Sequence, residues 1–293
     1  MATNANISAS DWADYELLDS GENMKLERYG GVIVARPETQ AIWKKQKPEL
    51  WDKAAAEFSW SENKGSWVTR GAVPDPWIVG WHGLSAFARL TPFKHVGIFP
   101  EQAPNWAWTG EKIAALRTAG TESPAVLNLF GYTGIASVAA AQAGAKVTHV
   151  DASKQSVAWA KDNAAVSGLP ETAIRWLVDD ALGFARREVR RGSKYHGIIL
   201  DPPAFGRGAK GEVWHIEEDL PALMDALKEL LSDAPGSFFL LNGYAAGYTP
   251  QSFLQLAQSS FGAQPAAEYG ELRLPESGSD RSVSAGIYVR FSR

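Results

Sequence analysis

From Pro124 onward, short apolar runs alternate with helical segments, and this alternation constrains the fold more than any other feature of the chain. It is typical of a parallel sheet built from βαβ units. Two consecutive strands at the end imply an antiparallel hairpin at the sheet edge. The sequence therefore predicts an α/β fold with a seven-stranded doubly wound sheet whose last strand is antiparallel. The expected strands cover residues 125–130, 146–150, 173–178, 196–201, 236–242, 267–273 and 284–291. The expected helices cover residues 134–143, 153–166, 181–191, 217–232 and 250–261.

The N-terminal third has a different character. Residues 1–110 contain nine of the 12 tryptophans, with many prolines and glycines and little helical periodicity. Such a composition suggests short strands and turns. We expect the tryptophans to pack a small, mainly β accessory or substrate domain over residues 1–110, and residues 111–293 to form the cofactor-binding domain.

Composition excludes several classes of protein. The 293 residues include no cysteine, which removes disulfide scaffolds, zinc-thiolate sites and thiol nucleophiles. The five histidines show no metal-ligand spacing, so no metal site is expected. A net charge of −4 argues against a strongly electrostatic nucleic-acid binder. The N-terminus lacks a signal peptide, and polar residues interrupt the most apolar stretch, 125–145, so we expect a cytoplasmic protein without a membrane span.

The first βα turn of the expected sheet carries the candidate cofactor site. Gly131 and Gly134 follow the strand in FGYTG, where a glycine turn lets the backbone approach a ligand beside a helix N-terminus. The next strand, KVTHVD, ends in Asp151, twenty residues after Gly131. A carboxylate at this place can accept hydrogen bonds from both hydroxyls of a ribose. Capping of the following helix is a compatible second role.

The turn also discriminates between cofactors. Dinucleotide binding favours G-x-G-x-x-G, whereas FGYTG contains the bulky Tyr132 and one glycine pair. A ligand without phosphates fits better, and S-adenosylmethionine supplies a ribose, an adenine and an amino-acid tail. We expect it to contact Phe130, Gly131, Tyr132, Thr133, Gly134, Asp151, Ala152 and Ser153.

An acid pair follows the third strand in RWLVDDALGF. Asp180 is the preferred acceptor for the adenine amino group, and Asp179 is nearly as plausible. Asp180 is equally able to cap the helix that begins at Ala181.

The fourth strand leads into Asp201-Pro202-Pro203-Ala204-Phe205. Two prolines remove two backbone donors and stiffen the turn, which is hard to explain by packing alone. Rigid carbonyls beside a carboxylate form an acceptor-rich edge that suits a planar nitrogenous base, with an aromatic ring stacked on its face. Asp201 is the candidate acceptor and Phe205 the candidate stacking residue, and a stiff structural turn is the alternative.

The order NLFGYTG, HVD, VDDA and ILDPPAF resembles the class I S-adenosylmethionine-dependent methyltransferases, which have a Rossmann-like fold. More narrowly, it is similar to the branch of bacterial large-subunit ribosomal RNA methyltransferases, over residues 95 to 293 or so. The resemblance implies that Asp201 also lies at the cofactor. It further implies that Phe99, Glu101 and Gln102 of HVGIFPEQAPNW line the cofactor pocket.

Two departures from the family limit the reaction. Members that methylate cytosine C5 use a cysteine, which is absent here, so that covalent route is excluded. Members that methylate amino groups resemble Asp/Asn-Pro-Pro-aromatic, whereas Ala204 follows Pro203 here. The sequence predicts a methyltransferase acting on RNA or a ribosomal subunit by direct transfer. A methyltransferase for a small molecule or protein, and a non-catalytic RNA-binding protein retaining the fold, are the alternatives. Oligomeric state is not predicted.

Overall fold

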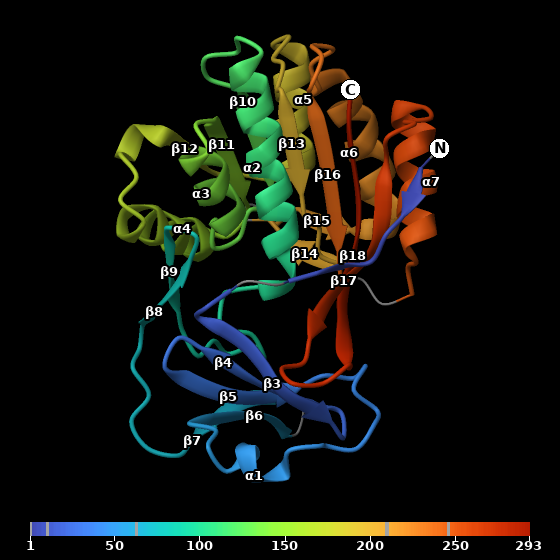
Figure 1. Ribbon diagram of the computed structural model, residues 1–293. Coiled ribbons are helices and arrows are strands. Elements are labelled where there is room, and N and C mark those ends of the chain that lie inside the picture. The colour runs from blue at the N-terminus through green and yellow to red at the C-terminus, as the bar shows by residue number, and fades with distance from the viewer. Residues whose placement is uncertain (1, 10–11, 62–63, 209–210, 245–246) are drawn as a thin grey trace. The chain divides into compact units, whose positions relative to one another are not determined.

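The computed structural model describes residues 2–9, 12–61, 64–208, 211–244 and 247–293 (Figure 1). The chain forms two compact units. The first comprises Met1–Ile7, Pro104–Leu272 and Gly286–Arg293, and the second comprises Ser8–Ala103 and Arg273–Ala285.

The first unit is built on a mixed sheet of nine strands among the described residues. Their order is β1-β17-β18-β16-β13-β10-β11-β12, with β2 paired to β17. Strands β12, β11, β10, β13 and β16 run parallel, and β18 runs antiparallel to β16. The bounds are β1 (Thr3–Asn4), β2 (Ile7–Ser8), β10 (Ala125–Leu129), β11 (Lys146–Asp151), β12 (Ile174–Val178), β13 (Gly197–Leu200), β16 (Phe238–Gly243), β17 (Glu268–Pro275) and β18 (Ser282–Ser292).

All seven predicted strands are present, with ends that differ by one or two residues. The predicted total for the sheet was wrong, because β1 and β2 also pair with β17. These additional strands have two residues each, which is too short for an alternation of apolar and polar residues to mark them.

The helices of the first unit lie on both faces of its sheet (Figure 1). They are α2 (Ala103–Thr118), α3 (Ile135–Gln142), α4 (Lys154–Val166), α5 (Ala181–Arg190), α6 (Ile216–Leu230) and α7 (Pro250–Phe261), with the 3-10 turn η2 (Glu171–Ala173). Helix α2 was not predicted. Its buried residues include the polar Asn105 and Thr109, which blur the apolar periodicity, although Pro104 in its first turn is favourable at a helix start.

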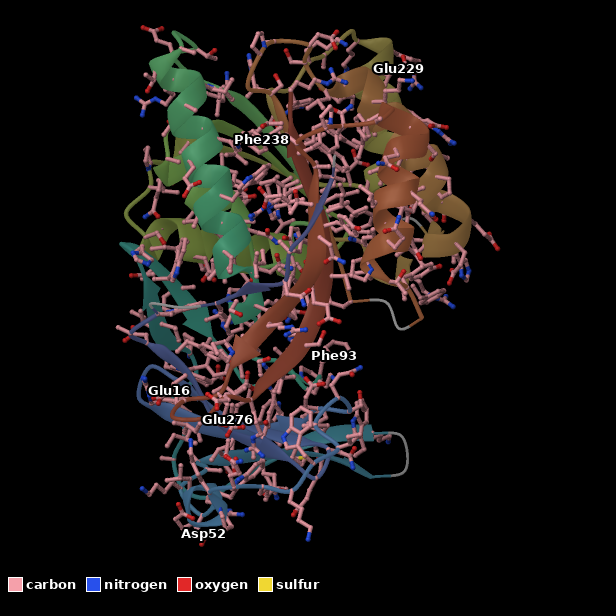
Figure 2. All side chains as sticks on the ribbon, turned by 45° about the vertical axis from the view of Figure 1, so that its right-hand side comes forward. Glu16, Asp52, Phe93, Glu229, Phe238 and Glu276 are labelled. Carbon is pink, nitrogen blue, oxygen red and sulfur yellow. The ribbon has the colours of Figure 1, made fainter. Side chains whose placement is uncertain are left out.

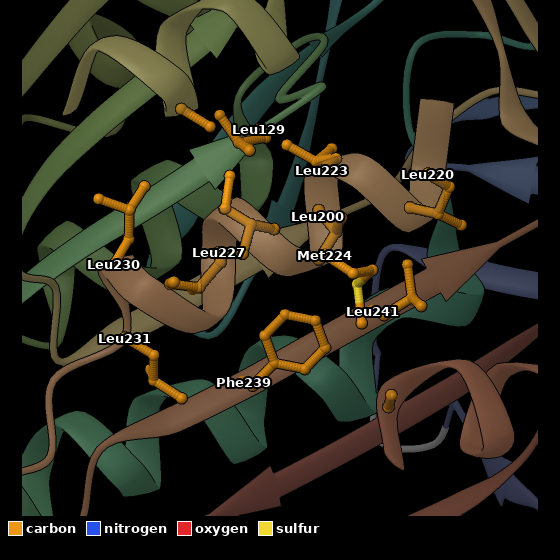
Figure 3. Packing of buried hydrophobic residues seen from close by; sticks show 14 of the residues in the cluster. Leu129, Leu200, Leu220, Leu223, Met224, Leu227, Leu230, Leu231, Phe239 and Leu241 are labelled. Carbon is orange, nitrogen blue, oxygen red and sulfur yellow. The ribbon is translucent and has the colours of Figure 1, made fainter. Parts of the chain in front are cut away.

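Apolar residues of α6 form the centre of the main core. Leu220, Leu223, Leu227 and Leu230 recur at helical spacing and are at most 2% exposed. Figure 3 shows them beside residues of β10, β13 and β16, among them Leu129, Leu200, Phe239 and Leu241. Helices α5 and α7 contribute to the same cluster. This packing fixes the carboxyl ends of the central strands, where the candidate site residues lie.

Helix α2 covers the opposite face of the sheet. Phe238 of β16, labelled in Figure 2, meets Trp108 of α2 edge to face, with ring centroids 5.6 Å apart. A Cβ atom on Gly197 of β13 would lie 2.2 Å from Cζ of Phe238, so this glycine makes room for the ring. Alternate residues of β13 and β16, beginning at Gly197 and Phe238, therefore face α2.

The second unit is β-rich. Its five-stranded sheet has the order β3-β4-β5-β6-β7, and β8 and β9 form a separate hairpin. The bounds are β3 (Tyr15–Gly21), β4 (Met24–Tyr29), β5 (Val32–Pro37), β6 (Ala56–Ser61), β7 (Lys64–Thr69), β8 (Trp77–Trp81) and β9 (Leu84–Ala88), with the short helix α1 (Pro48–Trp51) and the 3-10 turn η1 (Pro100–Gln102).

The tryptophans of this unit match the expected packing core only in part, because Trp12 and Trp77 are buried and others are not. Trp60 is 57% exposed, and Trp43, Trp51 and Trp67 are only half-buried. Each of these three indole N–H groups donates a hydrogen bond, for example Trp67 Nε1 to the Thr91 carbonyl at 2.7 Å. A buried ring needs a partner for this group, which favours boundary positions. The fully buried side chains of this unit include the apolar Leu26, Val34, Ala35 and Phe58.

Glu27 forms a buried ionic cluster in the second unit. Its carboxylate pairs with the Arg36 guanidinium and accepts hydrogen bonds from the hydroxyls of Tyr15 (2.9 Å) and Tyr29 (3.1 Å). Burial alone would raise the pKa of Glu27, but the charges of Arg36 and Lys25 outweigh it and lower the pKa to about 2. The carboxylate is therefore ionised at neutral pH.

Candidate functional site

The turn after β10 has an unusual backbone. Phe130 and Tyr132 have φ angles of 54° and 47°, and Gly134 has a φ of 78°. Left-handed backbone at bulky residues costs free energy and persists only where the surroundings impose it. The Gly131 N–H donates to the Val150 carbonyl at 3.1 Å, which fastens the turn to the end of β11. This turn then leads into α3.

A buried polar network supports the turn from below, and the sequence analysis missed it. Asn128 Nδ2 donates to Ser137 Oγ at 2.8 Å, and Ser137 Oγ lies 3.0 Å from Nδ1 of His149. The His149 ring packs directly under Gly131, because a Cβ atom there would be 2.4 Å from its Cε1 atom. Asn163 of α4 donates to the Thr133 carbonyl at 2.8 Å. The sequence signal for this network is a polar residue within an otherwise apolar strand, such as Asn128 or His149, because a buried polar side chain needs a hydrogen-bond partner.

Asp151 lies at the end of β11, beside the turn. Its Oδ2 accepts from the Tyr132 N–H at 2.9 Å, and its Oδ1 accepts from the Ser153 N–H at 2.8 Å. Burial raises the pKa of the Asp151 carboxyl above its ordinary value, while these two backbone hydrogen bonds act in the opposite direction. An ionised carboxylate offers about four lone-pair sites, so both oxygens retain capacity for hydroxyl donors.

Ser153 caps α4. Its Oγ accepts from the Ser156 N–H at 3.1 Å, so Asp151 is not needed as the cap of this helix. The helix N-terminus and the oriented carboxylate of Asp151 therefore stand next to each other.

Both members of the acid pair after β12 have structural partners. Asp180 is the N-cap of α5, where its Oδ2 accepts from the Gly183 N–H at 2.6 Å. Asp179 pairs with the Arg187 guanidinium. Capping and adenine recognition are compatible, because each carboxylate has further lone pairs. A contact between either residue and adenine stays a prediction.

The Asp201-Pro202-Pro203 turn follows β13 and leads into a short hairpin. Its strands are β14 (Phe205–Arg207) and β15 (Val213–His215). Phe205 is 51% exposed, and its ring meets that of His215 edge to face at 5.1 Å. The Arg207 guanidinium lies 5.9 Å from the centre of the Phe205 ring. The hairpin thus presents an aromatic surface directly after the turn.

Trp214 connects this turn to the turn after β10, and the sequence analysis did not single it out. Its Nε1 donates to the Pro203 carbonyl at 2.8 Å, and its ring lies 4.8 Å from that of Phe130. Trp214 is only 5% exposed. One buried side chain therefore sets the spacing between the residues expected to hold a cofactor and those expected to hold a substrate.

The remaining candidates belong to the second unit. Phe99 precedes η1, while Glu101 and Gln102 lie within η1 and are each 4% exposed. Burial raises the pKa of the Glu101 carboxyl, against the nearby charge of Lys25. Their predicted place in the cofactor pocket stays a prediction.

The described residues contain no group of three or more histidine, aspartate or glutamate side chains arranged to hold a metal ion. Among them, none of the helices combines the length and the apolar character that crossing a bilayer requires.

Comparison with known proteins identifies the family. The sequence profile of the S-adenosylmethionine-dependent methyltransferases matches residues 64–260. The chain is 39% identical to a SAM-dependent methyltransferase from Agrobacterium tumefaciens, whose crystal structure superimposes with a TM-score of 0.92 over 99% of this chain and 95% of that one. The chain belongs to the S-adenosylmethionine-dependent methyltransferase family, and it is a methyltransferase that uses this cofactor.

Two further likenesses are more limited. A putative SAM-dependent methyltransferase from Streptococcus mutans is 21% identical, with a TM-score of 0.73 over 97% of this chain and 76% of that chain, which shows a shared fold. The ribosomal RNA large subunit methyltransferase K/L of Shewanella baltica is 35% identical over 153 residues. That match covers 52% of this chain but only 20% of the relative, so the chain corresponds to about a fifth of that protein.

The residues present fit S-adenosylmethionine. Asp151 is a half-buried carboxylate that two backbone hydrogen bonds orient, as an acceptor for a ribose diol would need to be, and the turn beside it has no cluster of glycines for a pyrophosphate. The His149 ring packs against Gly131 and fixes the position of the turn relative to β11. The hydrogen-bonding groups at this turn therefore match a nucleoside without phosphates.

Proposed function

We propose that this chain transfers the methyl group of S-adenosylmethionine to RNA, and specifically to ribosomal RNA. The observation that carries this proposal is the 35% identity to the ribosomal RNA large subunit methyltransferase K/L over 153 residues. The exposed Phe205 beside the Asp201-Pro202-Pro203 turn supports it, because an aromatic ring at the surface suits a base removed from its stack.

For the cofactor end, we propose that Asp151 accepts hydrogen bonds from the ribose hydroxyls. Gly131 and Gly134 let the turn approach the nucleoside, together with Phe130, Tyr132, Thr133, Ala152 and Ser153. Asp180 or Asp179 contacts adenine. The support is the geometry of the turn, in which two backbone N–H groups already orient the Asp151 carboxylate.

For the reaction end, the cofactor supplies an electrophilic methyl carbon whose leaving group is a neutral thioether. The protein therefore has to orient the acceptor and remove one proton, with little further acid–base assistance. Asp201 holds an N–H of the acceptor and receives the proton that the acceptor loses. Pro202 and Pro203 keep the turn rigid, and Phe205 stacks on the base. Because the 293 residues contain no cysteine, transfer is direct.

We also propose a division of roles along the chain. Residues 1–110 serve as an accessory unit that contributes to substrate choice, and residues 111–293 bind the cofactor. A cytoplasmic location stays a prediction.

One assay tests the substrate. The purified protein and cofactor with a labelled methyl group are incubated with total RNA, with ribosomal subunits from cells that lack the gene, and with a metabolite and protein extract. Label in RNA is the expected result. Label found only in small molecules or proteins would contradict the RNA proposal, and cofactor binding without transfer to any fraction would indicate a non-catalytic RNA-binding protein.

A further inference from the structure

A series of hydrogen bonds, part-buried at Glu268 and buried from Arg290 onward, ends at the carboxyl end of β16. Glu268 of β17 pairs with Arg290 of β18, with its Oε2 2.6 Å from Nη2. Arg290 Nη1 donates to Asn105 Oδ1 of α2 at 3.1 Å, and Asn105 Nδ2 donates to Asn242 Oδ1 at 2.8 Å. Arg290, Asn105 and Asn242 are 8%, 0% and 4% exposed. All four residues belong to the first unit.

Arg290 sets the direction of these hydrogen bonds. A guanidinium can only donate hydrogen bonds, so the oxygen of Asn105 must face Arg290 and its NH₂ group must face Asn242. The oxygen of Asn242 is therefore occupied, and the end of the chain is an NH₂ donor. No described residue accepts a hydrogen bond from this nitrogen. Successive hydrogen bonds that begin at a cation polarise one another, which strengthens the terminal donor.

Asn242 lies next to Asp201 at the carboxyl ends of the central strands. In the parallel pair β13 and β16, Gly197 lies opposite Phe238 and Leu200 lies opposite Leu241. The next residues of the two segments, Asp201 after β13 and Asn242 in β16, therefore also lie opposite each other. Parallel neighbours are about 4.8 Å apart, and residues at the same level point to the same face. That face is the α2 side, because Phe238 contacts Trp108 and Asn242 bonds to Asn105. An acceptor and a donor thus lie side by side where the substrate is expected.

We propose that Asn242 donates a hydrogen bond to an acceptor atom of the methyl-accepting group, next to the N–H that Asp201 accepts. The pair requires a planar group in which an N–H stands beside a carbonyl oxygen or a bare ring nitrogen. Nucleobase edges carry this pattern on two adjacent atoms in one plane, whereas a ribose hydroxyl donates and accepts through a single oxygen. Asn242 is therefore a substrate-binding residue that selects base methylation over ribose methylation. This inference deepens the proposed function and rests on it.

Asn242→Asp tests the donor with almost no change of shape. The remaining Oδ1 still accepts from Asn105, but the NH₂ becomes a second carboxylate oxygen beside Asp201. Methyl transfer is measured on the RNA fraction that the wild-type protein labels, and the affinity for S-adenosylhomocysteine is measured by calorimetry. We expect kcat/KM to fall about 100-fold, the ratio that corresponds to an unmet buried hydrogen bond, while S-adenosylhomocysteine affinity stays within about two-fold.

Two further variants make the test specific. Gln255→Glu adds the same charge at an exposed position of α7 and should leave transfer unchanged. Asn242→Ser keeps a hydroxyl donor and should lose less activity than Asn242→Asp, with thermal melting recorded for both. If Asn242→Asp fails to fold, a loss in folded Asn242→Ser of about ten-fold in kcat/KM is the expected result, and its absence overturns the proposal.

Three results would overturn the inference. They are wild-type kcat/KM in folded Asn242→Asp, a parallel loss of S-adenosylhomocysteine affinity, and label recovered on ribose after digestion of the RNA to nucleosides. The proposed function fails separately if wild-type protein labels no RNA. In that case the same variants are assayed on the fraction that is labelled, and unchanged transfer there refutes the role of Asn242.

Discussion

Gly131→Ala should weaken cofactor binding by pressing the turn away from β11. The new Cβ atom would stand 2.4 Å from Cε1 and 2.5 Å from Nδ1 of His149, where ordinary contacts begin near 3.4 Å. The ring cannot move aside easily, because it is fully buried and its Nδ1 is tied to Ser137 Oγ. The φ angle of Gly131 is not in the left-handed region, so the effect is steric and not one of backbone preference.

The magnitude follows from the cost of overpacking. Inserting one methyl group into a well-packed site costs about 1–3 kcal/mol, and each 1.4 kcal/mol corresponds to about ten-fold in affinity. We therefore expect the Kd for S-adenosylhomocysteine to rise by about 5- to 150-fold, provided that the bound state needs the undistorted turn. Isothermal titration calorimetry gives the affinity, and chemical denaturation gives the free energy of unfolding.

The double variant Gly131→Ala/His149→Ala provides the control. Removing the imidazole opens space for the added methyl group, so the double variant should bind better than the sum of the single changes predicts, by about 1 kcal/mol or more. His149→Ala alone is expected to destabilise the fold, which denaturation records independently. Additive effects on the Kd in this cycle would refute the steric reasoning.

Asp151→Ala should abolish measurable cofactor binding in calorimetry, and unchanged binding in this variant would contradict the ribose assignment. Asp201→Ala should bind the cofactor normally but lose methyl transfer. Trp214→Phe, which keeps a ring but loses the N–H that bonds to the Pro203 carbonyl, should lower kcat by about ten-fold at a nearly constant cofactor Kd, whereas wild-type kcat would show that the bond does not position the turn. The depressed pKa of Glu27 implies that its contribution to stability is complete above about pH 4.5 and is lost as the pH falls towards 2. Glu27→Gln should therefore flatten the acid side of the stability curve measured by denaturation, and an unchanged curve would argue against this origin.

The acid stability of the first unit should depend on His149. Burial lowers the pKa of His149 to about 3, from an ordinary value of 6.5. Between pH 6.5 and about 3, His149 is protonated in the unfolded chain but neutral in the folded chain. The free energy of unfolding therefore falls as the pH drops through this range. His149→Asn should lose less stability over this range than the wild type in denaturation series at several pH values. An equal pH dependence in both proteins would exclude His149 as a source.

Local sequence patterns were sufficient for most of the elements in the first unit. The seven predicted strands and five predicted helices appear within one or two residues of their expected ends, because apolar periods of 2 and 3.6 directly reflect which face is buried. The same patterns missed α2, whose buried face includes Asn105, and the β14–β15 hairpin, whose strands have three residues each. Elements with few apolar residues or few residues of any kind carry too little periodicity.

For the candidate site, motifs identified the side chains that precede or follow the strands but not their supports. Gly131, Asp151 and Asp201 were found because a turn or an unusual pair of prolines marks them in the sequence. Trp214 looked like any other tryptophan until its N–H was seen at the Pro203 carbonyl. His149 resembled an ordinary strand residue until its ring was seen under Gly131.

The sequence by itself determined the βαβ order, the cofactor class and the absence of a cysteine-dependent route, because each of these depends on residue type and local spacing. Only the tertiary structure decided which buried polar groups act together. The bond from Arg290 to Asn105 joins residues 185 positions apart, and the direction of the chain that ends on Asn242 depends on that bond. A hydrogen-bond network is set by geometry between distant segments, and no local pattern in the sequence records it.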